Sequence, residues 1–230
     1  MHIEPGIVTG AKLALSYATA AGALGYSAKL AIDAARQDGF AALALRSLAT
    51  TTLVFAFFEL LPHYPVGVSE VHFIFGSTLL LIFGSAPAAI GLAAGLLLQG
   101  LLFAPSDLPQ YGVNVTTLLV PLFAMSLLAN RIIPARTAYK DVSYGQALAL
   151  STTFQAGIIA WVAFWALYGH GFAAENITAV GSFSAAYLLV IVVEPLLDLA
   201  VLAGAKALDG LRQSTFYRLL VQPRVHAAAA

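Results

Sequence analysis

The first two residues have the most definite chemistry in the chain, which opens Met1-His2-Ile3-Glu4-Pro5-Gly6. The α-amine of Met1, the backbone nitrogen of His2 and Nδ1 of the His2 ring can all bind one metal ion, because neighbouring pairs of these atoms close small chelate rings. Together they form three corners of a square plane, which suits Ni(II), Cu(II) or low-spin Co(II) better than Zn(II). The imidazole of His72 is our candidate for the fourth nitrogen.

Metal binding of this kind needs a free, unacetylated N-terminus. Its affinity should rise with pH, because the metal displaces the amide proton of His2. The alternative is that His2 merely belongs to a frayed terminus. Pro5-Gly6 favours the metal site, since it predicts a turn that folds the terminus back before the first apolar helix.

A second group of candidate residues lies in the Pro- and Gly-rich stretch 62–76. Ser69 is the predicted N-cap of a short helix, which places His72 in its first turn. Apolar residues follow His72, so it is either a core histidine hydrogen-bonded to a carbonyl or a ligand, since polar residues within membrane segments are candidates for function. His63, in the same stretch, is either an accessory ligand or a surface residue.

Other polar residues lie within apolar stretches. Asn114 is expected either to orient a ligating imidazole from behind or to cap the helix that follows it. Glu194 and Asp198 are four residues apart and therefore share one helix face. They form either a buried proton or ion site or a structural contact with Lys206 or a partner subunit.

The composition is that of an integral membrane protein. Of 230 residues, 60% are hydrophobic and 10% are charged, whereas soluble domains carry about 25% charged residues. The lack of cysteine excludes disulfides and thiolate metal sites, and the zero net charge without a basic tract argues against a nucleic-acid partner. The first residues lack the basic region of a cleavable signal peptide. The sequence contains no P-loop, HExxH or GxSxG motif, so we do not expect an enzyme.

Long apolar runs predict an all-α integral membrane fold, a bundle of seven transmembrane helices in one domain, residues 1–230. About 20 apolar residues cross a bilayer as a helix, and helices satisfy their own backbone polar groups in lipid. The third segment is short, and Ser85-Ala86-Pro87 separates it from the fourth. We expect segments at 8–30, 41–61, 71–83, 88–104, 113–130, 147–168 and 181–205, between a metal-binding N-terminal segment (1–7) and a cytoplasmic tail (206–230).

Basic residues predict the orientation, because Lys and Arg prefer the cytoplasmic side. The connections 62–70, 105–112 and 169–180 contain neither residue, and only Lys12 joins them on that side. The N-terminus is therefore expected outside and the C-terminus in the cytoplasm, with His63, His72 and His170 near the outer face. The residues on the inner side are Lys29, Arg36, Arg46, Arg131, Arg136, Lys140, Lys206, Arg212, Arg218 and Arg224.

Four stretches, in order over about the first half of the chain, resemble the CbiM/NikM family. These proteins are the membrane-embedded substrate-binding components of energy-coupling-factor importers for cobalt and nickel. Members begin Met-His-Ile before a turn, then have a Pro-Val loop leading to a Ser and His stretch, a Leu-rich run with Gln, and Gly-Ala-Asn-Val. The stretches here are 1–6, 65–72 with Gly76, 97–103, and Gly-Val-Asn-Val at 112–115.

The resemblance implies that the N-terminus, inserted from outside, binds Co(II) or Ni(II) as a transported substrate, with no permanently bound cofactor. The ligands would be the Met1 amine, the amide nitrogen and imidazole of His2, and the His72 imidazole. The implied location of the chain is the cell (inner) membrane. The implied partners are a transmembrane coupling subunit, ATPase subunits and a small accessory membrane subunit. The loop 105–109, Val113 and the order of residues in the first turn depart from the family pattern.

Two alternatives stay open. The departures favour an accessory, non-transport subunit that keeps the fold within a larger membrane complex. A haem protein or an intramembrane enzyme would use His63, His72 or His170, but only His72 lies within a predicted segment, and a haem held by two histidines needs both of them there.

Overall fold

The computed structural model describes residues 3–135 and 137–207. This part of the chain is a helical bundle with one short antiparallel hairpin. The helices are α1 (Leu13–Asp38), α2 (Phe40–Leu60), α3 (Gly76–Phe83), α4 (Ser85–Leu102), α5 (Tyr111–Ile132), α6 (Tyr144–His170) and α7 (Ala174–Ala207). The strands are β1 (Tyr64–Val66) and β2 (Ser69–Val71), and short 3₁₀ helices are η1 (Gly10–Lys12), η2 (Pro105–Gln110) and η3 (Tyr139–Asp141).

Each predicted segment overlaps one α-helix, so the all-α membrane fold is confirmed. Five of the described helices are long and apolar enough to cross a membrane: α2, α4, α5 with η2, α6 and α7. Helix α3 has 8 residues, well short of the roughly 20 that span a bilayer, and α1 carries charged residues in its last turns. The count of seven spans and the orientation stay predictions.

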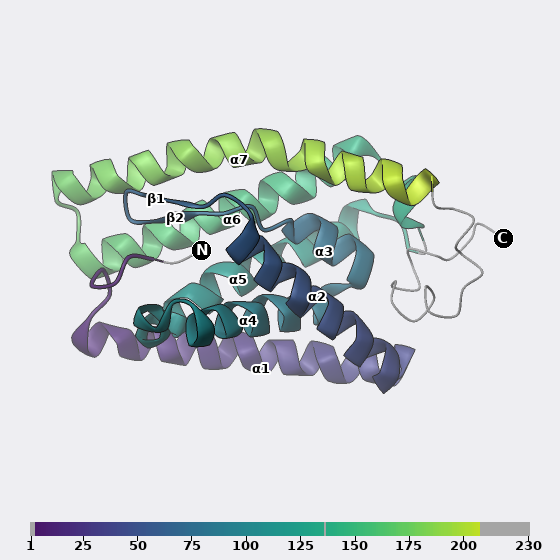
Figure 1. Ribbon diagram of the computed structural model, residues 1–230, viewed down its shortest axis with the longest axis horizontal. Coiled ribbons are helices and arrows are strands. Elements are labelled where there is room, and N and C mark those ends of the chain that lie inside the picture. Colours follow the sequence, from purple (N-terminus) through teal and green to yellow (C-terminus); the bar gives the residue numbers. More distant parts are fainter. Residues whose placement is uncertain (1–2, 136, 208–230) are drawn as a thin grey trace.

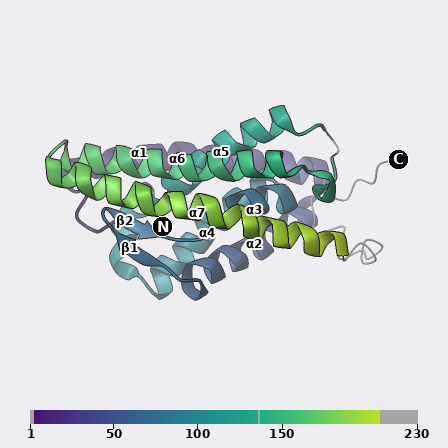
Figure 2. The same ribbon diagram turned by 90° about the horizontal axis from the view of Figure 1, so that it is seen from above.

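The helices lie in layers (Figures 1 and 2). Helices α6 and α7 run side by side along one edge, α1 runs along the opposite edge, and α4 and α5 lie between them. Helix α2 crosses α4 closely, since a side chain at Gly91 or Gly95 would clash with Thr50 or Val54. Small residues at this spacing are typical of close helix packing in membranes. The buried apolar side chains form one continuous core.

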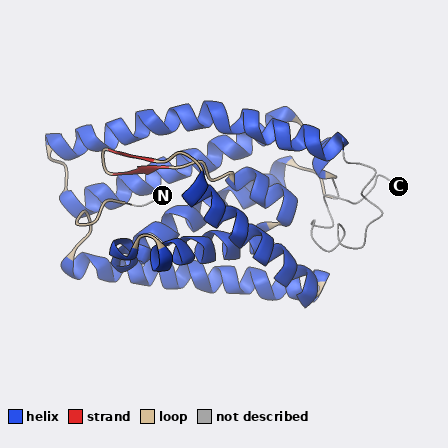
Figure 3. Ribbon diagram, in the orientation of Figure 1, coloured by secondary structure: helices blue, strands red, loops and turns tan. Residues whose placement is uncertain are grey.

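The third predicted segment begins differently from the prediction. Ser69 is a strand residue, paired with Val66 in the hairpin, so it is not a helix N-cap. Gly67 adopts a left-handed backbone (φ 63°) in the tight turn between the strands, a conformation that glycine adopts without strain. Residues 72–75 then run without regular structure to α3, and Gly84 (φ 95°) separates α3 from α4. Figure 3 shows the hairpin as the only strands of the described chain.

Candidate metal site

The start of the described chain lies beside the hairpin (Figure 1). Ile3 is completely buried and forms an antiparallel bridge with Ser69, next to strand β2. The N–H of Glu4 donates to the carbonyl of Val68 at 3.1 Å. The predicted ligands Met1 and His2 lie outside the described residues, but the residue that follows them is held inside the bundle.

Further contacts hold the segment that follows Ile3. The predicted turn at Pro5-Gly6 is present, and Nε2 of His170, at the end of α6, lies 3.2 Å from the carbonyl oxygen of Gly6. Gln110 donates to the Glu4 carbonyl at 3.3 Å. The expectation that the terminus folds back onto the bundle is therefore confirmed for residues 3–6.

His72 lies in the stretch without regular structure between β2 and α3, where its side chain is buried. Its Nε2 atom lies 2.9 Å from Oε2 of Glu70, so a carboxylate rather than a backbone carbonyl is its partner there. An ionised carboxylate only accepts, so in a neutral His72 ring this contact favours the tautomer with the proton on Nε2 and the lone pair on Nδ1. This carboxylate–histidine arrangement is common where the other ring nitrogen binds a metal.

Aromatic rings surround the His72 imidazole. The ring of Phe58 meets it edge to face, with 5.2 Å between centroids. The ring of His63 is stacked on it at 5.0 Å, with 14° between the planes. His63 itself is exposed and its Nδ1 lies 3.2 Å from the carbonyl of Leu61. His63 therefore covers one face of His72, and the two stacked rings do not face each other across a gap that could hold a haem.

Asn114 lies in the first turns of α5, but it is not the N-cap, a position that Gln110 occupies. The N-cap interpretation is therefore wrong: η2 leads directly into α5, which begins three residues earlier than Asn114. Its Oδ1 accepts a hydrogen bond of 2.9 Å from the N–H of Ile3. Asn114 thus orients the backbone that follows His2, and the contacts described for it do not include an imidazole.

Two residues near His72 were missed by the sequence analysis. Glu70 is two residues before His72, a spacing that places side chains on one face of an extended chain, so the strand pattern could have indicated it. Tyr187 of α7 is buried, and its hydroxyl lies 3.5 Å from the backbone nitrogen of His72 and 3.4 Å from its carbonyl. Its partner lies 115 residues away, and no local pattern indicates such a contact.

The described part of the chain does not contain a complete metal site. Within residues 3–135 and 137–207 no three His, Asp or Glu side chains gather closely enough to hold an ion. Ser69 and Asn114 both contact the buried residue Ile3 at the start of the described chain. A nitrogen site there depends on the two residues before Ile3.

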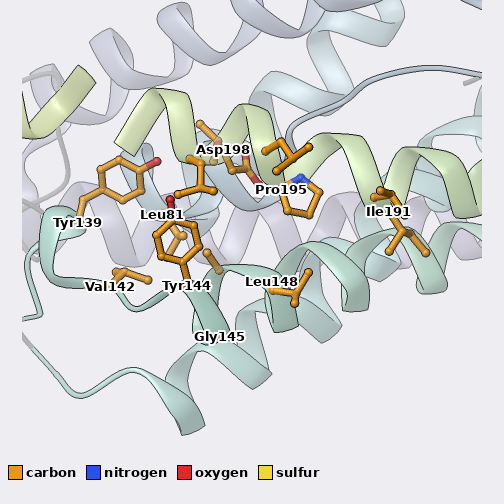
Figure 4. A pocket seen from close by; sticks show the side chains of 14 residues that line it. Leu81, Tyr139, Val142, Tyr144, Gly145, Leu148, Ile191, Pro195 and Asp198 are labelled. Carbon is orange, nitrogen blue, oxygen red and sulfur yellow. Dashed lines mark hydrogen bonds between the residues drawn. The ribbon is translucent and has the colours of Figure 1, made fainter. Parts of the chain in front are cut away.

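A cavity lies elsewhere, toward the C-terminal half of α7 (Figure 4). It has a volume of about 470 Å³ and is lined mainly by apolar side chains of α3, α6 and α7, together with Tyr139 of η3 and Asp198 of α7. Asp198 and the nearby Glu194 are buried. Their partners are side chains of α3 and α6, and the predicted contact with Lys206 involves a side chain outside those described.

Comparison with known proteins gives a family and a fold. A family model described as the cobalt uptake substrate-specific transmembrane region, CbiM, matches residues 2–208. A crystal structure described as that of a transition metal transporter is similar with a TM-score of 0.67 and 18% sequence identity, over 95% of this chain and 96% of that chain. At that identity the likeness shows the fold. No curated protein matches.

Proposed function

Because the chain belongs to the CbiM family of cobalt-uptake transmembrane proteins, we propose that it is the substrate-capture subunit of an energy-coupling-factor importer for cobalt or nickel. It is a multi-pass membrane protein of a transport family, with apolar helices long enough to cross a bilayer. The metal is the cargo of this protein. The nitrogen ligands proposed below accept both Co(II) and Ni(II).

The observation that carries the proposal is the burial of Ile3 between Ser69 and Asn114. Two residues of extended chain span at most about 7 Å, so the Met1 amine and the His2 nitrogens are restricted to the surroundings of Ile3. Ile3 pairs antiparallel with Ser69, so a chain that continued this pairing backward from Ile3 would lead toward the end of β2 and His72. These three nitrogens and the His72 imidazole would complete a square plane.

The pairing of Glu70 with Nε2 of His72 supports Nδ1 as the ligating atom. A carboxylate behind a ligating imidazole fixes the ring orientation and makes the other ring nitrogen a better electron-pair donor to a metal. Phe58 and His63 hold the ring from its edge and its face. Glu70 would therefore be a positioning residue for the metal site, and Asn114 would position the terminus.

Transport requires partners that this chain does not supply. With the N-terminus outside, the site would load from the exterior, and bound metal would fix the hairpin and the terminus together. A transmembrane coupling subunit would then expose the site to the cytoplasm, driven by separate ATPase subunits, with a small accessory membrane subunit. The loop that departs from the family pattern forms η2, and Gln110 at its end contacts Glu4. The loop thus keeps a role beside the terminus.

The test is metal binding by the full chain in lipid nanodiscs, with its native N-terminus and with a few residues added before Met1. We expect one equivalent of Ni(II) or Co(II) in the native form alone, with a visible absorption band of square-planar coordination. His2→Ala and His72→Ala should each abolish binding and metal-dependent uptake, whereas His226→Ala, in the tail, should change neither. Binding by both N-terminal forms would move the site to the loop histidines, and no binding by either would favour the accessory, non-transport subunit.

A further inference from the structure

Two carboxylates are buried side by side in α7. Glu194 and Asp198 have 0% and 5% of their surface exposed. They are four residues apart and share a helix face, so each negative charge makes the other harder to form. A basic partner would offset that cost, but neither carboxylate belongs to an ion pair among the described residues. A buried pair of this kind requires another source of compensation.

Asp198 has the partners expected of an ionised carboxylate. The hydroxyl of Ser77 donates to its Oδ2 at 2.6 Å, and the hydroxyl of Thr78 donates to its Oδ1. Both donors lie in the first turn of α3, where the helix dipole favours negative charge. Asp198 also lines the cavity in Figure 4, so it is the carboxylate nearer to an exchangeable environment.

Glu194 has one hydrogen-bond donor of normal geometry among the described residues. Nε2 of Gln155, in α6, donates to its Oε2 at 2.6 Å. The other carboxylate oxygen, and Oε1 of Gln155, have no hydrogen-bond partner of normal geometry among the described residues, although both side chains are fully buried. The backbone N–H groups of Ile74 and Phe75 face the carboxylate without closing such a bond. Two buried acceptors therefore lack a donor, which is costly.

One proton on Glu194 would give the two acceptor oxygens a shared hydrogen bond. A carboxylic acid and an amide form a cyclic pair, in which the acid O–H donates to the amide oxygen and the amide N–H donates to the acid. The pair also needs a proton on Glu194 if the amide nitrogen and oxygen of Gln155 exchange places. Two oxygens would then face each other at 2.6 Å, a distance typical of an O–H···O bond.

We propose that Glu194 and Gln155 form a proton-binding site between α6 and α7, in which Glu194 is protonated while Asp198 stays ionised. A metal ion fits less well, because the 2.6 Å contact leaves no room for an ion between the two side chains. The cavity touches Asp198 but neither Glu194 nor Gln155. The site is separate from the nitrogen site proposed above, and its test does not depend on bound metal.

The proton allows α7 to pack against the stretch that carries His72. Along α7, Tyr187 is bonded to the backbone of His72, Glu194 lies beside residues 74–75, and Asp198 holds the start of α3. Among the described residues, the titratable groups that face the pair are Tyr187 and Tyr139. Burial and the Asp198 carboxylate raise the pKa of Tyr139. All are acids, so losing the proton would leave two adjacent negative charges, and we expect α7 to part from residues 72–78.

Infrared difference spectroscopy of the full chain in nanodiscs, without metal, tests the proposal. We expect a protonated-carboxyl C=O band near neutral pH that is lost in Glu194→Gln, kept in Asp198→Asn, and shifted to higher frequency in Gln155→Leu. A missing band, or one lost only in Asp198→Asn, would overturn the assignment. So would a band that disappears when Na⁺, K⁺ or Mg²⁺ is added at constant pH, because the pair would then be a metal cation site.

Thermal unfolding against pH gives a second readout. The unfolded chain ionises its glutamates near pH 4.3 (about the model-peptide value), so a protein that keeps Glu194 protonated takes up a proton on folding. Its stability is present at low pH and is lost as pH rises through the titration of folded Glu194. The melting temperature should fall with rising pH in the wild type and fall less in Glu194→Gln. Parallel curves for the two proteins would contradict the proposal.

Discussion

The Asn114 side chain accepts a hydrogen bond of 2.9 Å from the backbone N–H of Ile3, although 111 residues separate the two. Both residues are buried. The bond ties the start of the chain to α5, and the bridge from Ile3 to Ser69 ties it to the hairpin. Ile3 is therefore a fixed point inside the bundle, which is a requirement for a metal site built on the terminal amine.

Replacing Asn114 by leucine should release that fixed point. The change leaves the N–H of Ile3 buried without an acceptor, which costs about 1–3 kcal/mol of stability. Nickel affinity should fall about tenfold or more, the usual size of a lost supporting contact at a metal site. Calorimetric titration and thermal unfolding in nanodiscs measure the two effects.

Thr117→Val is the matched control for this change. Thr117 is also buried in α5, but its hydroxyl donates to the Val113 carbonyl of its own helix. We expect wild-type metal affinity in this variant. An unchanged affinity in Asn114→Leu would show that the terminus does not need its anchor on α5.

Glu70→Ala tests the orientation of His72. Removing the carboxylate 2.9 Å from Nε2 frees the ring to rotate and to change tautomer, and such losses reduce metal affinity about 10–100-fold. Glu70→Gln keeps an acceptor oxygen and should lose less. Calorimetric titration with Ni(II) and with Co(II) ranks the three proteins.

Glu175→Ala provides the comparison for the loss of one negative charge. Glu175 is exposed in the first turn of α7, and its removal should leave metal affinity unchanged. If Glu70→Ala and Glu175→Ala weaken binding equally, Glu70 acts by general electrostatic attraction and does not position His72.

Gly67→Ala tests the packing of the hairpin on α7. Gly67 has a left-handed backbone, and a side chain there would collide with the backbone of Ala179. Gly171→Ala imposes a similar positive φ with open space around it, so it isolates the conformational strain, about 1 kcal/mol. The melting temperature should fall much further for Gly67→Ala, with a loss of metal affinity. Equal melting temperatures would mean that the hairpin is not packed against α7.

The helices could be predicted from the sequence because long apolar runs and their polar interruptions are local signals. The hairpin could not, because β2 has three residues and its apolar neighbours also suit a helix. Ser69 was consequently assigned as a helix cap, although its partners are Val66 and Ile3. Short strands depend on what they pair with, and β2 pairs with β1 and, at Ser69, with the distant residue Ile3.

The candidate site divides in the same way. His72 could be identified as a candidate because a histidine within an apolar segment is rare. The role of Asn114 could not, because its partner lies in a segment 111 residues away. The partners of Glu194 and Asp198 are likewise on other helices, α6 and α3, where the sequence had suggested the basic tail.

The orientation can be tested because the chain contains no cysteine. Ser106 in η2 and Ala135 after α5 are both exposed. With the N-terminus outside, a membrane-impermeant maleimide added to intact cells should label Ser106→Cys and spare Ala135→Cys until the membrane is opened. The reverse pattern would invert the orientation, and labelling of both in intact cells would mean that α5 does not cross the membrane.

The pH dependence of metal binding separates a terminal-amine site from a site of imidazoles alone. A peptide α-amine loses its proton at about pH 7.7–8.0, whereas the His2 amide proton is displaced only by the metal. Two protons therefore leave below that pH, so affinity should rise about a hundredfold per pH unit there, and about tenfold per unit above it. Histidine side chains in peptides lose their protons at about pH 6.5, so the metal affinity of a site built from imidazoles alone would level off above neutral pH. Calorimetric titrations from about pH 6.5 to about pH 8.5, which bracket the pKa of the amine, distinguish the two kinds of site. A metal affinity that stays constant above neutral pH would exclude the amine and amide as ligands.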